Sequence, residues 1–120
     1  MKVMVVDDEA DVRLLFEQRF RKEIRSGSIA FYFVQSAQEA LTFLESQEKD
    51  LLVLSDINMP GMSGFELLTQ IKRMRPDVPV IMISAYGEDK QAMALELGAD
   101  GFVSKPIDFQ TLRPLILQER

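Results

Sequence analysis

The sequence contains neither cysteine nor histidine. The absence of cysteine excludes disulfide bonds and metal sites built on thiolates. The absence of histidine removes the side chain that best serves general base catalysis near neutral pH. No apolar run approaches the roughly 18 residues of a membrane span, and the first apolar run begins at Lys2, so we expect neither a signal peptide nor a membrane segment. These absences favour a cytoplasmic protein.

Negative charge also limits the partners. The 120 residues include 19 Asp and Glu against 14 Lys and Arg, a formal net charge of −5. Such a charge argues against direct binding to nucleic acids or anionic membranes, although a local basic face can persist within it. The length, with 47% hydrophobic residues, suits one domain at residues 1–120 that needs no disulfide staples.

Five short apolar runs alternate with segments of helical periodicity. The runs lie at residues 2–7, 29–34, 51–55, 80–84 and 102–104. Each is rich in Val, Ile, Leu or Phe and predicts a strand buried on both faces, which is typical of parallel sheets. The alternation predicts a doubly wound, flavodoxin-like α/β fold, (βα)5, with five parallel strands in the order 2-1-3-4-5 and five helices.

Three helices are predicted before the fourth strand, one after each of the first three strands. One helix after the first strand has an apolar face formed by five residues, namely Val12, Leu15, Phe16, Phe20 and Ile24. Ser36 with Glu39, and Ser63 with Glu66, have the spacing of capping boxes. The helix after Ser63 has an apolar face that includes Met74.

The last two helices carry weaker signals. Apolar residues at 89–97 point in several directions, so we expect that helix to pack less firmly and to be more mobile than its neighbours. Asp108 is the expected N-cap of the final helix. Pro114 lies inside this helix, where it should produce a kink or a late start.

Three carboxylates follow two strands that are neighbours in the expected order. Asp7 and Asp8 follow the first strand and Asp56 follows the third, so they should meet at the carboxyl edge of the sheet. At about 4–5 Å and an effective dielectric of about 20, each ionised pair repels by roughly 3–4 kcal/mol. The cluster should therefore take up a cation or protonate one member, and near neutral pH we expect a cation. The oxygen ligands favour Mg²⁺ over zinc or copper.

A hydroxyl and an ammonium flank these carboxylates. Ser84 ends the fourth strand and Lys105 follows the fifth, where both could hold an anion beside Asp56. A carboxylate nucleophile between a divalent ion and such groups has the parts needed for phosphoryl transfer. Taken singly, each residue has a plainer interpretation: Asp56 and Ser84 as turn residues, and Lys105 as a solvated charge.

Four separated motifs together resemble the receiver domain of two-component response regulators, the CheY-like family. They are VVDDE at residues 5–9, SDINMPGMSG at 55–64, SAYG at 84–87 and ADGFVSKP at 99–106. By this resemblance, Asp56 would be the phosphoacceptor. Asp8 would bind Mg²⁺ directly, Asp7 would act partly through water, and the main-chain carbonyl of Asn58 would be a third protein ligand.

The resemblance also implies a switch. Lys105 would pair with the phosphoryl group, the Ser84 hydroxyl would move toward it, and the Phe102 ring would change rotamer. Ser and Phe stand where Thr and Tyr are common in the family, so the outward hydrogen bond of a phenol is missing. Read-out of the signal could differ in detail.

The implied function is a phosphorylation-activated signalling switch rather than an enzyme with ordinary turnover. The chain would catalyse its own phosphorylation and dephosphorylation. A histidine kinase or phosphotransfer protein would supply the phosphoryl group, since the chain has no histidine. An output partner or C-terminal effector domain would read the altered surface, and phosphorylation-dependent dimerisation is a further expectation.

Two alternatives stay open. A magnesium-dependent aspartyl phosphatase could use Asp7 as its nucleophile, with Glu9 two residues on, but this leaves Asp56 and Lys105 without roles. A scaffold receiver could act through protein contacts alone, which the intact acidic site disfavours. A flavodoxin-type redox domain would need a glycine- and hydroxyl-rich phosphate cradle after the first strand, whereas this chain has DDEAD there.

Overall fold

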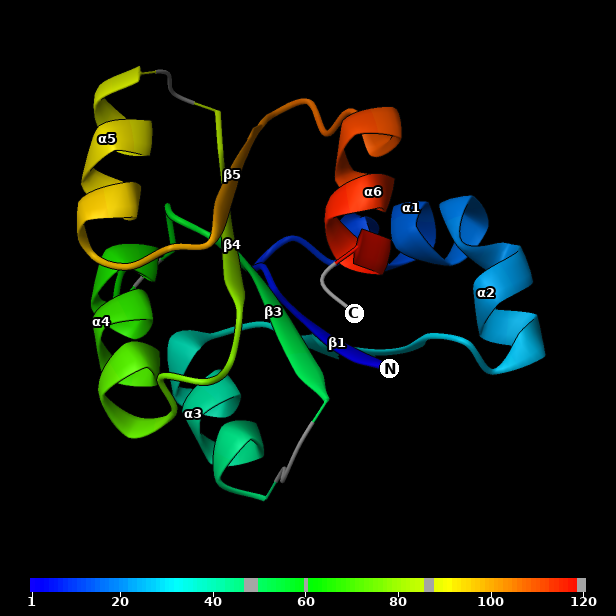
Figure 1. Cartoon of the computed structure of the whole chain (residues 1–120), viewed down its shortest axis with the longest axis horizontal. Coiled ribbons are helices and arrows are strands. Elements are labelled where there is room, and N and C mark those ends of the chain that lie inside the picture. The colour runs from blue at the N-terminus through cyan, green and yellow to red at the C-terminus, as the bar shows by residue number, and fades with distance from the viewer. Residues whose placement is uncertain (47–49, 60, 86–87, 119–120) are drawn as a thin grey trace.

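Five strands form one parallel sheet in the computed structural model, which describes residues 1–46, 50–59, 61–85 and 88–118. The strands are β1 (Lys2–Val6), β2 (Ala30–Val34), β3 (Leu51–Asp56), β4 (Val80–Ser84) and β5 (Gly101–Ser104). They lie in the order β2-β1-β3-β4-β5 and every neighbouring pair is parallel (Figure 1), which confirms the predicted topology. Pro60, Tyr86 and Gly87 of the quoted motifs lie outside the described residues.

Helices cover both faces of this sheet. They are α1 (Asp11–Arg19), α2 (Arg21–Ser26), α3 (Ala37–Glu45), α4 (Gly64–Met74), α5 (Glu88–Glu96) and α6 (Phe109–Gln118). One apolar core packs α3, α4 and α5 against the sheet, and a second packs α1 and α6 against the opposite face (Figure 1). Alternate residues of β1 and β3 contribute to the two cores, as expected for strands buried on both faces. No described helix is long and apolar enough to cross a membrane.

β2 is not the fully buried strand that its apolar sequence predicted. β3 is buried along its whole length, whereas β2 has only exposed and half-buried residues. The reason is position, because β2 pairs with β1 alone and forms one edge of the sheet. Phe31 and Phe33 still pack against the core beneath α1, while Tyr32 on the other face is 36% exposed.

The single helix predicted after β1 is in fact two helices. Phe20 separates α1 from α2 in a non-helical conformation, with φ −115° and ψ 28°. Phe20 is buried as predicted, but Leu15 and Ile24 of the predicted apolar face are exposed. At the break, Arg113 of α6 donates a hydrogen bond to the carbonyl of Arg19, the group that would accept from the amide of residue 23 in a continuous helix.

The two predicted capping boxes have different outcomes. The Ser63 hydroxyl accepts from the Glu66 amide at 3.3 Å and the Glu66 carboxylate accepts from the Ser63 amide at 3.1 Å, so the box at α4 is complete. At α3, Ser36 caps the Glu39 amide at 3.1 Å. The Glu39 carboxylate accepts instead from the Gln35 amide, so only half of that box forms.

Two details at helix ends also differ from the sequence prediction. Met74, assigned to the buried face of α4, is 44% exposed because it lies in the last turn. α6 begins directly after Asp108, whose carboxylate accepts from the Gln110 amide at 2.9 Å. Pro114 therefore does not delay the start of α6, and the lost backbone bond falls within its second turn.

Candidate functional site

Asp7 and Asp56 lie at the carboxyl edge of the sheet because β1 and β3 are paired in parallel register, with Val6 beside Ser55. Asp7 is 6% exposed and Asp56 is 5% exposed. Asp8 is exposed to solvent. One carboxylate oxygen of each aspartate lies within 4.8 Å of the others, so the predicted meeting of three carboxylates is confirmed.

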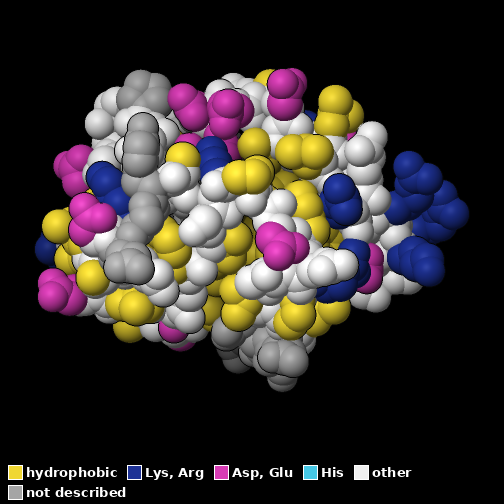
Figure 2. All heavy atoms as spheres, turned by 90° about the horizontal axis from the view of Figure 1, so that it is seen from above, with side chains coloured by type: hydrophobic (Ala, Val, Ile, Leu, Met, Phe, Trp, Pro, Cys, Tyr) yellow, Lys and Arg dark blue, Asp and Glu magenta, His cyan; other side chains and the backbone are white. Residues whose placement is uncertain are grey.

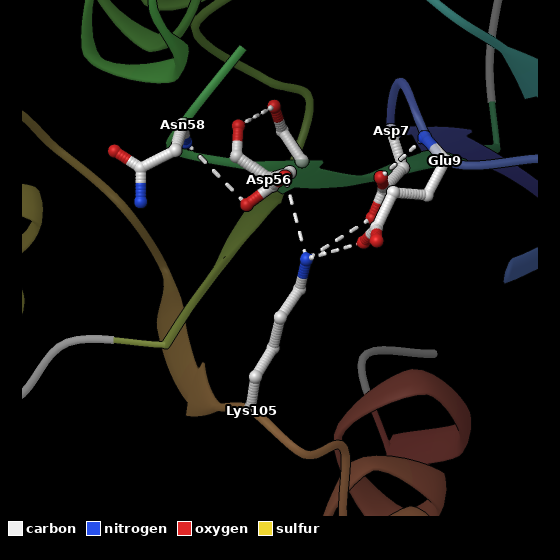
Figure 3. Close-up of polar contacts among 6 residues, drawn as sticks. Asp7, Glu9, Asp56, Asn58 and Lys105 are labelled. Carbon is white, nitrogen blue, oxygen red and sulfur yellow. Dashed lines mark hydrogen bonds and ion pairs between the residues drawn. The ribbon is translucent and has the colours of Figure 1, made fainter.

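Lys105 joins this cluster from the far side of β4. Its ammonium nitrogen lies 3.4 Å from Asp56 Oδ2 and 3.5 Å from Asp7 Oδ2 (Figure 3). The Lys105 amide also donates to the Ser84 carbonyl at 2.8 Å, which fixes the base of the side chain at the end of β4. The lysine predicted to face Asp56 therefore does so, with most of its side chain shielded from water.

The sequence did not predict that Glu9 would contact Lys105. Its Oε1 lies 3.4 Å from the Lys105 ammonium, while its amide donates to Asp7 Oδ1 at 2.9 Å (Figure 3). The sequence offered one indication that Glu9 belongs to the site, since it is the third acid after the first strand. From the sequence, Glu9 was considered only as a partner of Asp7. The fold shows that this loop faces the lysine after β5.

Burial raises the pKa of Asp7 and of Asp56 above the usual aspartate value, because removal from water disfavours the charged form. The Lys105 charge and the amides of Glu9 and Asn58 act in the opposite direction without cancelling this effect. Burial also acts to lower the pKa of Lys105, but the charges of Asp7 and Asp56 raise it, and the net shift is upward. Lys105 is thus firmly charged beside two carboxylates of weakened acidity.

The backbone after Asp56 is held close to the start of α4. Asp56 Oδ1 accepts from the amide of Asn58 at 3.4 Å, and the Gly64 amide donates to the Ile57 carbonyl at 2.8 Å. A Cβ atom at Gly64 would lie 2.3 Å from the Asp56 carbonyl oxygen, so only glycine permits this approach. The glycine at the start of α4 therefore helps to position the candidate nucleophile.

Comparison with known families covers nearly the whole chain. The model of the response regulator receiver domain matches residues 3–117. The chain belongs to this family. As a receiver domain it is part of the machinery of two-component signalling, which the four motifs had implied. The fold of this receiver agrees with that of the solved family members to which it was compared.

Individual relatives differ in how much of them the receiver represents. It is 37% identical over 119 residues to the response regulator protein PilR of Pseudomonas aeruginosa, covering 96% of this chain and 25% of that protein. It is 34% identical over 116 residues to sporulation initiation phosphotransferase F of Bacillus subtilis, covering 96% and 90%. The solved structure of the Thermotoga maritima response regulator TrrA with Mg²⁺ and BeF shares 29% identity and a TM-score of 0.82, covering 98% and 96%. The chain thus spans about a quarter of PilR.

Ser84 and Phe102, the predicted switch residues of the receiver, lie on the same face of the sheet. Ser84 ends β4 and is fully buried, and Phe102 in β5 is partly buried against the core of α3, α4 and α5. Phe102 pairs with Met82, which precedes Ser84 by two residues. Because strand side chains alternate between faces, Ser84 and Phe102 both project to the side covered by α5.

The donor set of the receiver fits a hard divalent cation. Three carboxylate oxygens converge, and exposed Asp8 leaves one side open to water molecules that can complete an octahedron. Receiver domains generally bind Mg²⁺, and the TrrA structure is described with that ion. Asn58 lies beside Asp56, and its main-chain amide points toward the Asp56 carboxylate (Figure 3).

Proposed function

We propose that this receiver, as one domain at residues 1–120, is a phosphorylation-activated switch in which Asp56 is the phosphoacceptor. The observation that carries the proposal is the position of Asp56: it is 5% exposed at the end of the central strand, with the Lys105 ammonium at 3.4 Å. A buried carboxylate beside a fixed cation suits a group that must receive negative charge.

The chemistry is one displacement at phosphorus. An oxygen of the ionised Asp56 carboxylate attacks the phosphoryl group of a donor phosphohistidine and forms an acyl phosphate. The P–N bond breaks, and its electron pair returns to the imidazole, which leaves neutral after taking up a proton. Lys105 moves from the carboxylate oxygen to the transferred phosphoryl oxygens, so its charge offsets theirs throughout the step.

Four groups are proposed to hold Mg²⁺, namely the carboxylates of Asp7, Asp8 and Asp56 and the main-chain carbonyl of Asn58. The ion would neutralise charge on the phosphoryl oxygens opposite Lys105. The three aspartates repel one another when all are ionised, so the cluster gains most from a cation at the point where an incoming phosphoryl group adds further charge.

The proposed read-out follows from Ser84 and Phe102. A dianion on Asp56 would draw the Ser84 hydroxyl toward it, and Phe102 on the same face would turn into the space that Ser84 vacates. The surface that changes is formed by α5, β5 and α6. Only Ala94 among the described side chains of α5 is buried, while Met93 and Leu95 are each 50% exposed, which agrees with the predicted weak apolar face.

Partners are proposed from the relatives. A cytoplasmic histidine kinase or phosphotransfer protein would donate the phosphoryl group, and an output partner or C-terminal effector domain would bind the altered surface. NtrC of Salmonella typhimurium, 35% identical with 24% of its length covered, is a DNA-binding transcriptional regulator. Sporulation initiation phosphotransferase F, covered to 90%, is the counterpart for a free-standing receiver. Direct binding of nucleic acid or membrane by this domain is not part of the proposal.

Covalent labelling tests the assignment of Asp56. Incubation with acetyl phosphate and Mg²⁺ should add about 80 Da to the wild-type chain, the mass of one phosphoryl group, and none to Asp56→Asn. Asp7→Asn separates the two candidate nucleophiles: because Asp7 is proposed to help hold Mg²⁺, labelling of this variant should be slower, but the label should still lie on Asp56. A label that persists in Asp56→Asn and is lost in Asp7→Asn would instead support the phosphatase alternative.

A further inference from the structure

A basic surface lies at one end of this acidic molecule. It is formed by five of the 14 Lys and Arg residues, namely Arg19, Arg21, Lys22, Arg25 and Arg113. Figure 2 shows Lys and Arg side chains gathered at the end of the molecule where α2 lies in Figure 1. Two acids, Glu17 and Glu23, line the same hollows, so this surface has a local charge of +3 within a chain of net charge −5.

The surface is held in place by α6. Arg113 forms an ion pair with Glu23, donates to the Arg19 carbonyl and lies over the Phe20 ring, with its guanidinium carbon 4.5 Å from the ring centroid. The guanidinium carbon of Arg19 in turn lies 5.3 Å from the centroid of the Phe109 ring. These contacts hold the break between α1 and α2, so α2 presents its cations from a fixed position.

Three cations of this surface are available to a partner. Arg21, Lys22 and Arg25 are exposed, and none forms an ion pair with the residues that the structure describes. Arg21 and Arg25 are four residues apart and therefore lie on one side of α2. Like charges at this spacing repel, which disfavours the helix unless an anion lies between them.

An apolar side chain shares a hollow with two of these arginines. Ile24 is 37% exposed and lines a hollow of about 330 Å³ together with Glu17, Arg21 and Arg25. A second hollow of about 460 Å³ shares Arg21 with the first and is lined by four of the basic residues and by Gln18 and Glu23. An apolar seat flanked by guanidinium groups suits a side chain such as Leu carried within an acidic peptide.

We propose that α2 is a docking surface for an acidic segment of a partner protein, with an apolar side chain of that segment seated on Ile24 in the hollow that Arg21 and Arg25 also line. Charge favours a short peptide over a nucleic acid. The chain outside the basic surface has a net charge of −8, which repels a polyanion longer than the surface itself. Ile24 also offers an apolar contact that a phosphate backbone cannot use.

This docking surface is separate from the phosphorylation site. α1 begins at Asp11 beside the acidic loop and runs for nine residues, or about 14 Å, before α2 starts. A segment bound on α2 therefore does not cover Asp56 or Lys105. Peptide binding and covalent labelling of Asp56 are independent measurements, so the failure of one proposal leaves the other standing.

Fluorescence anisotropy with defined probes tests the proposal. The first probe is a labelled peptide of about ten residues, all Glu except one central Leu, and the second replaces Leu with Glu. The third is a single-stranded oligonucleotide of the same charge as the first. We expect the Leu-containing peptide to bind most tightly. The double variant Arg21→Gln with Arg25→Gln should weaken it on the order of tenfold, and Ile24→Ser should reduce it to the level of the all-Glu peptide.

The matched control is the double variant Arg73→Gln with Lys90→Gln, which lowers the net charge equally from −5 to −7 at other helices. It should change binding much less than the α2 variant. Circular dichroism checks that each variant keeps its fold. Equal losses in the two double variants, tighter binding of the oligonucleotide, or sedimentation showing that the chain self-associates through these arginines would each overturn the proposal.

Discussion

Lys105 Nζ lies 3.4 Å from Glu9 Oε1, the same distance that separates it from Asp56 Oδ2. The two contacts differ in environment, because the Glu9 side chain is 66% exposed and the Asp56 side chain only 6%. Glu9 is thus a solvent-facing carboxylate that shares the Lys105 ammonium with the candidate phosphoacceptor. In the proposed phosphorylation, Lys105 would loosen its contact with Glu9 as it turns toward the phosphoryl group.

Glu9→Gln should therefore accelerate phosphorylation by acetyl phosphate. An ion pair with one exposed partner contributes about 0.2–1 kcal/mol, so the rate should rise by no more than about fivefold at saturating Mg²⁺. The rate is measured by the loss of unmodified protein in intact-mass spectra. Glu17→Gln removes the same charge from an exposed pair with Arg13 and should leave the rate unchanged. A slower Glu9→Gln variant would show that Glu9 positions Lys105 productively.

The acidic cluster predicts one weak Mg²⁺ site. Asp8→Asn should lower the affinity measured by isothermal titration calorimetry by at least about tenfold, because it removes one of three converging carboxylate charges. Asp11→Asn is the control, since Asp11 is an exposed acid in the first turn of α1 outside that cluster. Equal affinities of wild type and Asp8→Asn would exclude Asp8 as a ligand.

The sequence predicted the sheet and its reactive edge because both depend on short-range signals. Four of the five apolar runs end in, or directly precede, a candidate site residue, and strand order then brings Asp7, Asp56 and Lys105 together. The break at Phe20 was not predicted, and the side chain that contacts the carbonyl freed there, Arg113, lies more than 90 residues away in the sequence. The contact between Glu9 and Lys105 was not predicted either, because the loop after β1 and the loop after β5 are distant in the sequence and lie together only in the folded chain.

The raised pKa of Asp7 predicts a stability that depends on pH. Because the folded-state pKa lies above the unfolded value, the folded chain binds the extra proton between the two values. The stability that protonation of Asp7 gives to the folded chain is fully present below the unfolded pKa of about 3.9. This stability is lost as the pH rises through the folded pKa. Without divalent ions, Asp7→Asn should therefore raise the melting temperature at pH 7 and have a smaller effect at acid pH.

Asp77 provides the opposite control. Its hydrogen bond with Arg75 lowers its pKa below the usual aspartate value, so ionisation of Asp77 favours the folded state above the unfolded pKa. Asp77→Asn should lower the melting temperature slightly at neutral pH, because the pair is exposed. Melting curves followed by circular dichroism at both pH values measure the two effects. A lower melting temperature of Asp7→Asn at pH 7 would show that its pairing with Lys105 outweighs its burial.

The positions of Ser84 and Phe102 predict which part of the chain changes on phosphorylation. Beryllofluoride with Mg²⁺, a phosphoryl mimic, should change amide hydrogen exchange in the described part of residues 85–102, because α5 has few buried side chains and can move when Phe102 turns. Two charge-assisted hydrogen bonds, from Ser84 and Lys105, suffice to shift an equilibrium of a few kcal/mol. Ser84→Ala should blunt the change. Ser104, the exposed ladder partner of Ser84, supplies the control, and Ser104→Ala should respond like wild type. A change confined to the loop after Asp56, or an undiminished response in Ser84→Ala, would rule out this route from Asp56 to α5.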